Sequence, residues 1–367
     1  MENKINVRQL CFVIVTIFSI TKFYTLPAIV SGASGEAGCQ ALLLNFIIDF
    51  LLLLTCVYII KNQPKKCLYD TSCWYFGKPL TKLAFFVYAV YFIIKAFIPI
   101  LEQKNTISLT FYESQPTLLI FMPYFIVAFY LVVKGVNAFF RSVEIISWLF
   151  VAGLIITLAL SIPSAEFTAL LPIVQPAKKI LHGSSTAFLW FGDPVSILFF
   201  EKFLSSKKNL TKKSVIAFSI SALITVVLVA VFYSIFQSIS QRQYYAPIKM
   251  SKYSLTLSNV GRLDYFAALL FSLVSVYAVT MPILLSNICL MQVFKVKKPF
   301  VTGTILVLCE TVLLFFFQNR IFENIVFIQT YLMPFLLIVC YAFPLIMFLT
   351  ILINKKINFK RQGLNNV

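Results

Sequence analysis

Long runs of apolar residues, separated by short polar segments, recur from one end of the chain to the other. Each run is long enough to cross the hydrocarbon core of a bilayer, which takes about 20 residues of α-helix. We expect ten transmembrane helices, at residues 8–30, 40–60, 83–101, 117–134, 143–162, 184–203, 212–237, 265–292, 300–318 and 327–353. No loop is long enough to fold by itself, so residues 1–367 are expected to form one all-α integral membrane domain.

Two of these spans are interrupted by polar residues and proline. The first contains SITKFYTLP, in which Pro27 removes a backbone donor and clashes with the carbonyl group four residues earlier. The sixth contains WFGDPVS, where Pro194 has the same effect. Interrupted spans at matching places in two halves are typical of transporters built from inverted repeats, with the binding site at the breaks. We therefore predict two inverted five-helix repeats, at about 8–162 and 184–353; a simple kink at each proline is the alternative.

The composition excludes a soluble globular protein. Apolar residues make up 60% of the chain and the mean hydropathy is +0.90, whereas about half is usual for soluble proteins. The net charge of +18 is the excess of 31 Lys and Arg over 13 Asp and Glu residues, and most of the Lys and Arg lie in loops that we assign to the cytoplasm. This distribution predicts cytoplasmic N- and C-termini by the positive-inside rule. It favours orientation in a membrane, with some attraction to anionic lipid, over nucleic-acid binding.

A charged residue accompanies each predicted break. Lys22 lies in the first span, where a cation costs about 2.5–3.5 kcal/mol on insertion scales, so its side chain should face protein or a cavity. Asp193 lies at the other break and is the natural counter-charge. The two side chains are expected either to pair or to hold the ammonium and carboxylate groups of an amino-acid ligand. Snorkelling of Lys22 to the membrane surface is the alternative.

Further candidates are polar or aromatic residues within apolar spans: Asp49, Tyr91, Lys95, Trp190, Phe191, Tyr277 and Glu310. For Lys95 and Asp49 two roles are open, proton coupling or a structural pair. Glu310 is expected to contact a partner subunit or another span. The aromatic residues are candidates to line the ligand cavity, with ordinary packing as the alternative.

Signatures of an enzyme or a metal site are missing from the sequence. The single histidine, His182, has no nucleophile pattern near it. Cys67 and Cys73 are close in one loop, but no histidine or further cysteine completes a zinc set, so neither a metal nor a cofactor is expected. The longest outer loop, at about 238–264, is amphipathic and is expected either to lie at the membrane interface or to fold over an outer cavity.

Several segments carry a family resemblance in the same order along the chain. They are INVRQLCFVIVTIF, followed by LP and SGASGEAG; YLVVKGVNAFFRSVEI; LLPIVQPAKKILHGSSTAFLWFGDPVSILFF; and NVGRLDYFAALLF. This set resembles the spore germination permeases, the B subunits of bacterial germinant receptors. The resemblance covers nearly the whole chain and agrees with the ten spans expected from hydropathy and charge.

The resemblance implies the amino acid–polyamine–organocation fold, with two inverted repeats and unwound first and sixth helices. It also implies residence in the spore inner membrane, binding of a small nutrient such as an amino acid, and action with A-type and C-type receptor subunits. The binding positions that it implies are Lys22, Phe23, Tyr24, Thr25 and Leu26 in the first span and Phe191, Gly192 and Asp193 in the sixth. Members of the family usually have small or glycine residues before Leu-Pro, so the bulky side chains of this chain are expected to reshape the site.

We therefore expect a germinant-sensing permease subunit in which ligand binding at the broken helices signals or drives transport. An autonomous amino acid/proton symporter of the same fold is the second hypothesis, with Lys22 or Lys95 titrating during transport. A membrane scaffold subunit that binds no ligand is the third. The ligand and any coupled ion are not encoded in a recognisable motif.

Overall fold

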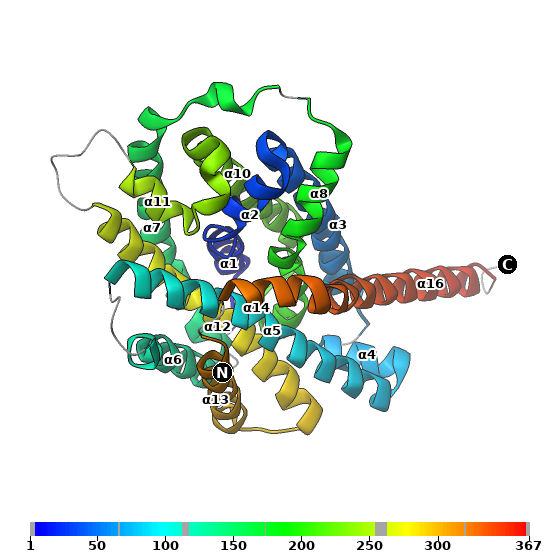
Figure 1. The fold of residues 1–367 in the computed structure, drawn as a ribbon. Coiled ribbons are helices and arrows are strands. Elements are labelled where there is room, and N and C mark those ends of the chain that lie inside the picture. The colour runs from blue at the N-terminus through cyan, green and yellow to red at the C-terminus, as the bar shows by residue number, and fades with distance from the viewer. Residues whose placement is uncertain are drawn as a thin grey trace.

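Helices account for nearly all of the described chain (Figure 1). The computed structural model describes residues 4–64, 67–111, 117–172, 174–253, 263–318 and 321–364. Its helices are α1 (Val7–Ile20), α2 (Leu26–Ser34), α3 (Gly38–Asn62), α4 (Leu68–Phe76), α5 (Lys78–Phe111), α6 (Thr117–Lys134), α7 (Val136–Ser161), α8 (Ala177–Ala187), α9 (Ser196–Phe200), α10 (Leu210–Phe236), α11 (Ala246–Lys252), α12 (Leu263–Phe294), α13 (Pro299–Phe317), α14 (Ile321–Phe327), α15 (Met333–Leu337) and α16 (Phe343–Leu364). Within these ranges the β-structure is a single isolated bridge between Ile5 and Leu204.

Seven helices within the described ranges are long and apolar enough to cross a membrane. They correspond to the predicted second, third, fifth, seventh, eighth, ninth and tenth spans. The three other predicted spans are shorter or interrupted: the first is divided into α1 and α2, the fourth is α6, and the sixth is divided into α8 and α9. The all-α membrane fold and the two interrupted helices are therefore confirmed.

The structure corrects two of the predicted spans. The third, expected at 83–101, belongs to the much longer helix Lys78–Phe111. The tenth, expected as one helix at 327–353, contains two π-helical segments, Ile328–Leu332 and Ile338–Ala342. A π-segment inserts an extra residue per turn and often marks a functional position, because it turns backbone and side chains toward a neighbour.

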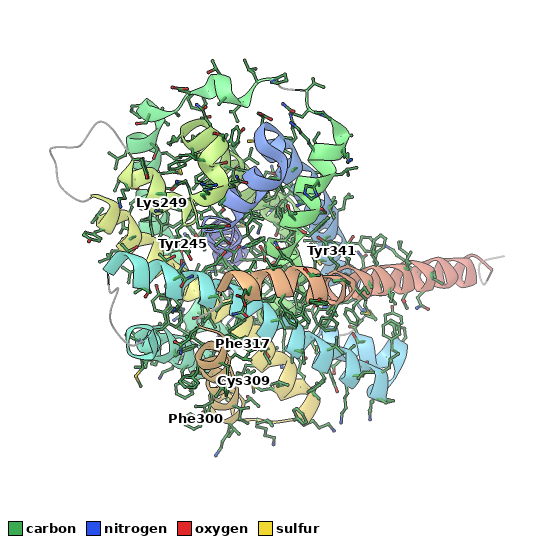
Figure 2. All side chains as sticks on the ribbon, in the orientation of Figure 1. Tyr245, Lys249, Phe300, Cys309, Phe317 and Tyr341 are labelled. Atoms are coloured by element: carbon green, nitrogen blue, oxygen red, sulfur yellow. The ribbon has the colours of Figure 1, made fainter. Side chains whose placement is uncertain are left out.

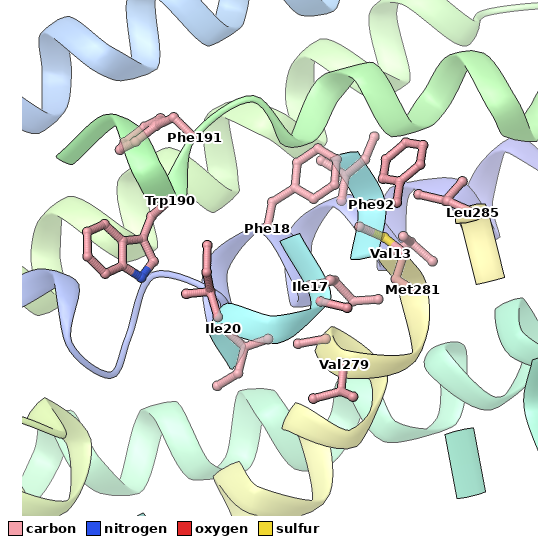
Figure 3. Close-up of a cluster of buried hydrophobic side chains, with 14 of the residues drawn as sticks. Val13, Ile17, Phe18, Ile20, Phe92, Trp190, Phe191, Val279, Met281 and Leu285 are labelled. Atoms are coloured by element: carbon pink, nitrogen blue, oxygen red, sulfur yellow. The ribbon is translucent and has the colours of Figure 1, made fainter. Parts of the chain in front are cut away.

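The centre of the bundle is formed by α1, α5 and α12. Helix α12 packs along α5, and α1 packs against α10, α7 and α12. Figure 3 shows Val13 and Ile17 of α1 in one apolar cluster with Phe92 of α5 and with Met281 and Leu285 of α12. Because α1 is surrounded by protein, the residues that follow it at the first break are buried rather than exposed to lipid.

The outer segment after α10 folds back over the first break. A 3-10 helix, Gln237–Arg242, packs on α2, and α11 packs on α12 and α7. The backbone amides of Tyr245 and Ala246 donate hydrogen bonds of 3.0 and 3.2 Å to the carbonyl oxygen of Tyr24. Tyr245 and Lys249 are labelled on this segment in Figure 2. The described part of this loop thus folds back onto the bundle at the first break, and its position at a membrane interface stays a prediction. Residues 254–262 of the loop lie outside the described ranges.

Candidate functional site

The first break spans residues 21–25, between α1 and α2. The amides of Lys22 and Phe23 bond to carbonyl groups only three residues earlier, at Ser19 and Ile20, so the helix tightens and ends. Pro27 stands in the first turn of α2, where its missing N–H group has no helical partner to lose. The break therefore releases Tyr24 and Thr25 from regular helix, and the Tyr24 carbonyl group finds its partners in the α11 segment.

The second break lies at Phe191 and Gly192, between a 3-10 turn that follows α8 and another that precedes α9. Gly192 has a φ of +91°, a left-handed conformation that glycine adopts without a steric penalty. A Cβ atom at this position would lie 2.6 Å from Cys340 Sγ and 3.3 Å from Tyr91 Oη. Both the backbone conformation and the surrounding side chains therefore require glycine here.

Lys22 and Asp193 join the two breaks in a buried ion pair. Lys22 Nζ contacts Asp193 Oδ2 and donates a second hydrogen bond of 3.0 Å to the carbonyl oxygen of Phe18. The side chains are 2% and 7% exposed, and the ammonium group lies 5.1 Å from the centre of the Phe191 ring. The structure thus has the paired form of our hypothesis, and snorkelling of Lys22 is wrong because its side chain is enclosed.

Lys95 and Asp49 stabilise the second break from opposite sides, and neither is the other's partner. Lys95 Nζ donates to the carbonyl oxygens of Leu189 and Phe191, at 3.0 and 2.8 Å, and lies 3.9 Å from Asp193 Oδ1. Both carboxylate oxygens of Asp49 accept from the amide of Gly192, at 3.1 and 3.0 Å. A cation thus faces freed carbonyl groups and an anion faces a freed amide, which is what a broken helix needs in an apolar surrounding.

The π-helical segment of the tenth span contributes the next contacts. Tyr341 Oη donates a hydrogen bond of 2.7 Å to Asp49 Oδ1, and Cys340 Sγ donates one of 3.3 Å to the carbonyl oxygen of Gly192. Tyr341 is labelled beside the bundle centre in Figure 2. The sequence analysis missed both residues, because hydropathy alone does not distinguish a π-segment from an ordinary helix.

Glu102 is a third buried carboxylate at the site, beside Asp49 and Asp193, and it connects the two breaks. Unlike those two, it was not predicted from the sequence. It accepts hydrogen bonds from Thr25 Oγ1 of the first break and, at 3.0 Å, from Trp190 Nε1 of the second. The predicted span ended one residue before it, whereas α5 continues through it. The available signal was its spacing from Lys95, since seven residues are two helical turns and put both side chains on one face.

The aromatic residues of the first break turn away from Asp193. Phe23 packs against Phe150 and Phe271, with ring centres 5.6 and 6.0 Å apart. Tyr24 Oη forms a hydrogen bond of 2.9 Å with Ser275 Oγ on α12. Both therefore fasten the break to α7 and α12, while Leu26 is fully buried at the start of α2.

Two other predicted positions lie away from the breaks. Tyr277 is half-buried beside Phe139, with ring centres 6.1 Å apart, and is not among the residues that line the central cavity. Glu310 is fully buried in α13, which packs on α6, α12 and α5. Of the two expectations for Glu310, contact with another span is the one that fits its burial within the chain.

A small cavity of about 40 Å³ lies between the breaks. Its lining includes Thr21, Tyr91, Lys95, Trp190, Gly192 and Asp193. Ligand pockets usually measure about 300–1,000 Å³, so the cavity in this conformation has room for only a few water molecules. The ion pair and its hydrogen bonds fill the centre. Figure 3 shows Trp190 and Phe191, which lie next to each other in the chain at the second break.

Replacing Glu102 by Leu is expected to lower the thermal stability of the purified protein. The change leaves the Trp190 indole N–H and the Thr25 hydroxyl without their acceptor, at a cost of about 1–3 kcal/mol each. Glu102→Gln keeps an amide oxygen as acceptor and is the matched control, with a smaller expected loss. Thermal unfolding in detergent measures both; equal losses in the two variants would contradict the bridging role.

Comparisons with known proteins identify a sequence family and a fold. A family model described as "Spore germination protein" matches residues 4–325. Spore germination protein KB of Bacillus subtilis (strain 168) is 24% identical over 98% of both chains. Among solved structures, one similar fold is the Eremococcus coleocola manganese transporter in complex with an aromatic bis-isothiourea substituted compound. The TM-score is 0.61 and the sequence identity is 11%, and the match covers 95% of this chain and 84% of that chain.

A second solved structure, MhsT in complex with L-phenylalanine, has a TM-score of 0.59 and 14% identity, and covers 94% of this chain and 98% of that chain. At such identities the likeness establishes the fold alone. It is the fold expected of an all-α transporter with inverted repeats, and the two helix breaks are its central feature.

Proposed function

Because the chain belongs to the spore germination permease family, we propose that it is the permease-like subunit of a nutrient germinant receptor and binds its nutrient between the two helix breaks. We further propose that it resides in the spore inner membrane with both termini in the cytoplasm. Its partners in this proposal are the A-type and C-type receptor subunits.

The observation that carries this proposal is the buried pair of Lys22 and Asp193, which links the two breaks directly. Around it lie a second cation, Lys95, and a second carboxylate, Asp49. Such a site matches a small zwitterion, whose ammonium group fits Asp193 and whose carboxylate fits a lysine ammonium. We therefore propose an amino acid as the nutrient.

The size of the cavity supports sensing by a conformational change. In the closed site the ammonium group of Lys22 occupies the position next to Asp193 that a ligand ammonium would need. A nutrient must therefore displace Lys22, and its higher affinity for the conformation in which this pair is open would shift the protein toward that conformation. Helices α2 and α9, which follow the breaks, are the segments that would move first.

An autonomous amino acid/proton symporter is the second candidate. The observation that favours it is the collection of ionisable side chains at one buried place, Lys22, Lys95, Asp49 and Asp193. Proton-coupled transporters use such groups within the membrane. The scaffold hypothesis is less favoured, since a subunit without a ligand has no need to bury four charges at two helix breaks.

Spores that lack this gene are expected to lose germination in response to at least one amino acid of a panel that also contains sugars and salts. Restoring the gene should restore the response, and restoring it with Lys22→Met and Asp193→Asn together should not. Uptake of the active amino acid by proteoliposomes that contain only this protein would favour the symporter. The same assay is repeated in spores that also lack the other receptor genes. A normal response of those spores to the whole panel would contradict the receptor proposal.

A further inference from the structure

An apolar groove runs along the outside of the bundle between α1, α7 and α10, which pack on one another (Figure 1). Its volume is about 330 Å³, and its lining includes Phe12, Val15, Trp148, Val151, Ile216 and Ile220. The side chains of Trp148 and Ile216 are 68% and 50% exposed, so the groove opens outward. In a membrane such a surface faces the hydrocarbon chains of the lipid.

A polar cavity of about 500 Å³ adjoins one end of this groove. Arg8 and Lys213 line both spaces, so the two are continuous around these cations. The rest of its lining is Val7 and the polar residues Asn6, Ser205, Ser206, Lys208 and Asn209. We call this end, with Arg8, Lys208 and Lys213, the basic mouth. The distribution of Lys and Arg assigns it to the cytoplasmic surface.

The charges at the basic mouth are only partly neutralised. Arg8 pairs with Glu144 of α7, and Gln9 also donates to that carboxylate, at 3.2 Å. Arg8 nevertheless remains 73% exposed, and a guanidinium group has five N–H donors. Lys208 and Lys213 form none of the ion pairs found within the described ranges. Three cations against one carboxylate leave an excess of positive charge.

We propose that this surface binds an anionic phospholipid of the cytoplasmic leaflet, with its phosphate in the basic mouth and an acyl chain in the groove. The apolar and cationic parts are joined end to end, in the order in which a lipid presents its chain and headgroup. A soluble anion would leave the groove unfilled, and a zwitterionic lipid would bring its own cation to three others. Lysine and arginine near an anionic membrane surface each add attraction to such lipids.

The position of the groove gives the lipid a physical connection to the central site. At its inner wall Thr16 of α1 donates a hydrogen bond of 2.7 Å to Ser147 of α7. Helix α1 ends at Ile20, just before Lys22 and the first break. A bound lipid would therefore hold α1 against α7 and α10 and stabilise the helix from which the break departs.

The test is to count lipids that stay bound to the purified full-length protein, by native mass spectrometry after delipidation and addition of phosphatidylglycerol or phosphatidylcholine. The wild-type protein is expected to retain phosphatidylglycerol preferentially. Lys208→Gln with Lys213→Gln is expected to weaken this binding by about 25-fold, since each cation near the surface contributes about fivefold. This variant leaves the Arg8–Glu144 pair intact, so it should fold; its melting temperature verifies that.

The matched control is Lys297→Gln with Lys298→Gln, which removes two cations from another cytoplasmic loop and should leave the retained lipid unchanged. Equal loss in the two variants would overturn the proposal in favour of general surface charge. Displacement of the lipid by inorganic phosphate alone would overturn it in favour of a soluble anion. If the Lys208→Gln, Lys213→Gln protein instead loses a co-purified receptor subunit and retains its lipid, the surface binds a protein partner.

Discussion

Asp193→Asn protein is expected to be less stable than Lys22→Met protein and to give no nutrient response. Asp193 is the anion between two lysines, so its neutralisation removes the ion-pair partner of both Lys22 and Lys95. Neutralising Lys22 leaves Asp193 with Lys95. Removal of one partner from a buried ion pair costs about 3–5 kcal/mol, and Asp193→Asn is expected to reach or exceed that range. Thermal unfolding of the purified protein measures the stability, and the spore germination assay measures the response.

The double variant tests whether the charges are coupled. Lys22→Met with Asp193→Asn leaves only Lys95 unpaired, so we expect its stability to lie between those of the two single variants. A double variant less stable than Asp193→Asn would mean that the pair in the structure contributes nothing. Glu36→Gln is the control, because it breaks the 3.6 Å contact to Lys179 in a partly exposed pair and should cost less than about 1 kcal/mol.

Gly192→Ala is expected to produce the second large effect. It should lower the free energy of unfolding by about 2–5 kcal/mol and abolish the nutrient response. A left-handed conformation costs a residue with a Cβ atom roughly 1–2 kcal/mol. The added methyl group would also lie 2.6 Å from Cys340 Sγ, and overpacking of this kind typically costs about 1–3 kcal/mol more. The amide of Gly192 is also the group that bonds to Asp49, so the clash should displace the backbone of the second break.

Two further variants separate the conformational cost from the steric cost. Gly135 also has a positive φ, +86°, and a Cβ atom there would have no neighbour within 4 Å, so Gly135→Ala should show a conformational cost alone. Its ψ of −176° lies in a region that is essentially restricted to glycine, whereas Gly192 has a ψ of 5°, so the conformational cost at Gly135 should be at least as large. Adding Cys340→Ala to Gly192→Ala should recover much of the steric part and none of the conformational part. If Gly192→Ala with Cys340→Ala is no more stable than Gly192→Ala alone, the close approach of Cys340 to Gly192 has no energetic weight.

Much of this architecture could be predicted from the sequence, because the bilayer imposes one strong rule. An apolar run must form a helix that satisfies its own backbone, so hydropathy alone located the seven long helices and α6. Prolines and polar residues inside such runs located both breaks. A lone cation in the first span and an anion in the sixth indicated the ion pair, since neither charge is stable alone in that surrounding.

The partners of the breaks could not be predicted in this way. Glu102 reaches Thr25 and Trp190 only because α5 extends past its predicted end. Tyr341 reaches Asp49 only because a π-segment rotates the tenth span. Both depend on where helices far apart in the sequence cross one another, and hydropathy carries no information on that.

The sequence by itself thus determined the membrane class, the helix breaks and the charges placed at them, because each follows from the cost of exposing a polar group to lipid. The tertiary structure alone decided how those charges are used. It turned Phe23 and Tyr24 toward α7 and α12, placed Lys95 and Asp49 on opposite sides of the second break, and closed the central cavity around Lys22 and Asp193. These outcomes depend on distances of a few ångströms between helices, which only their packing sets.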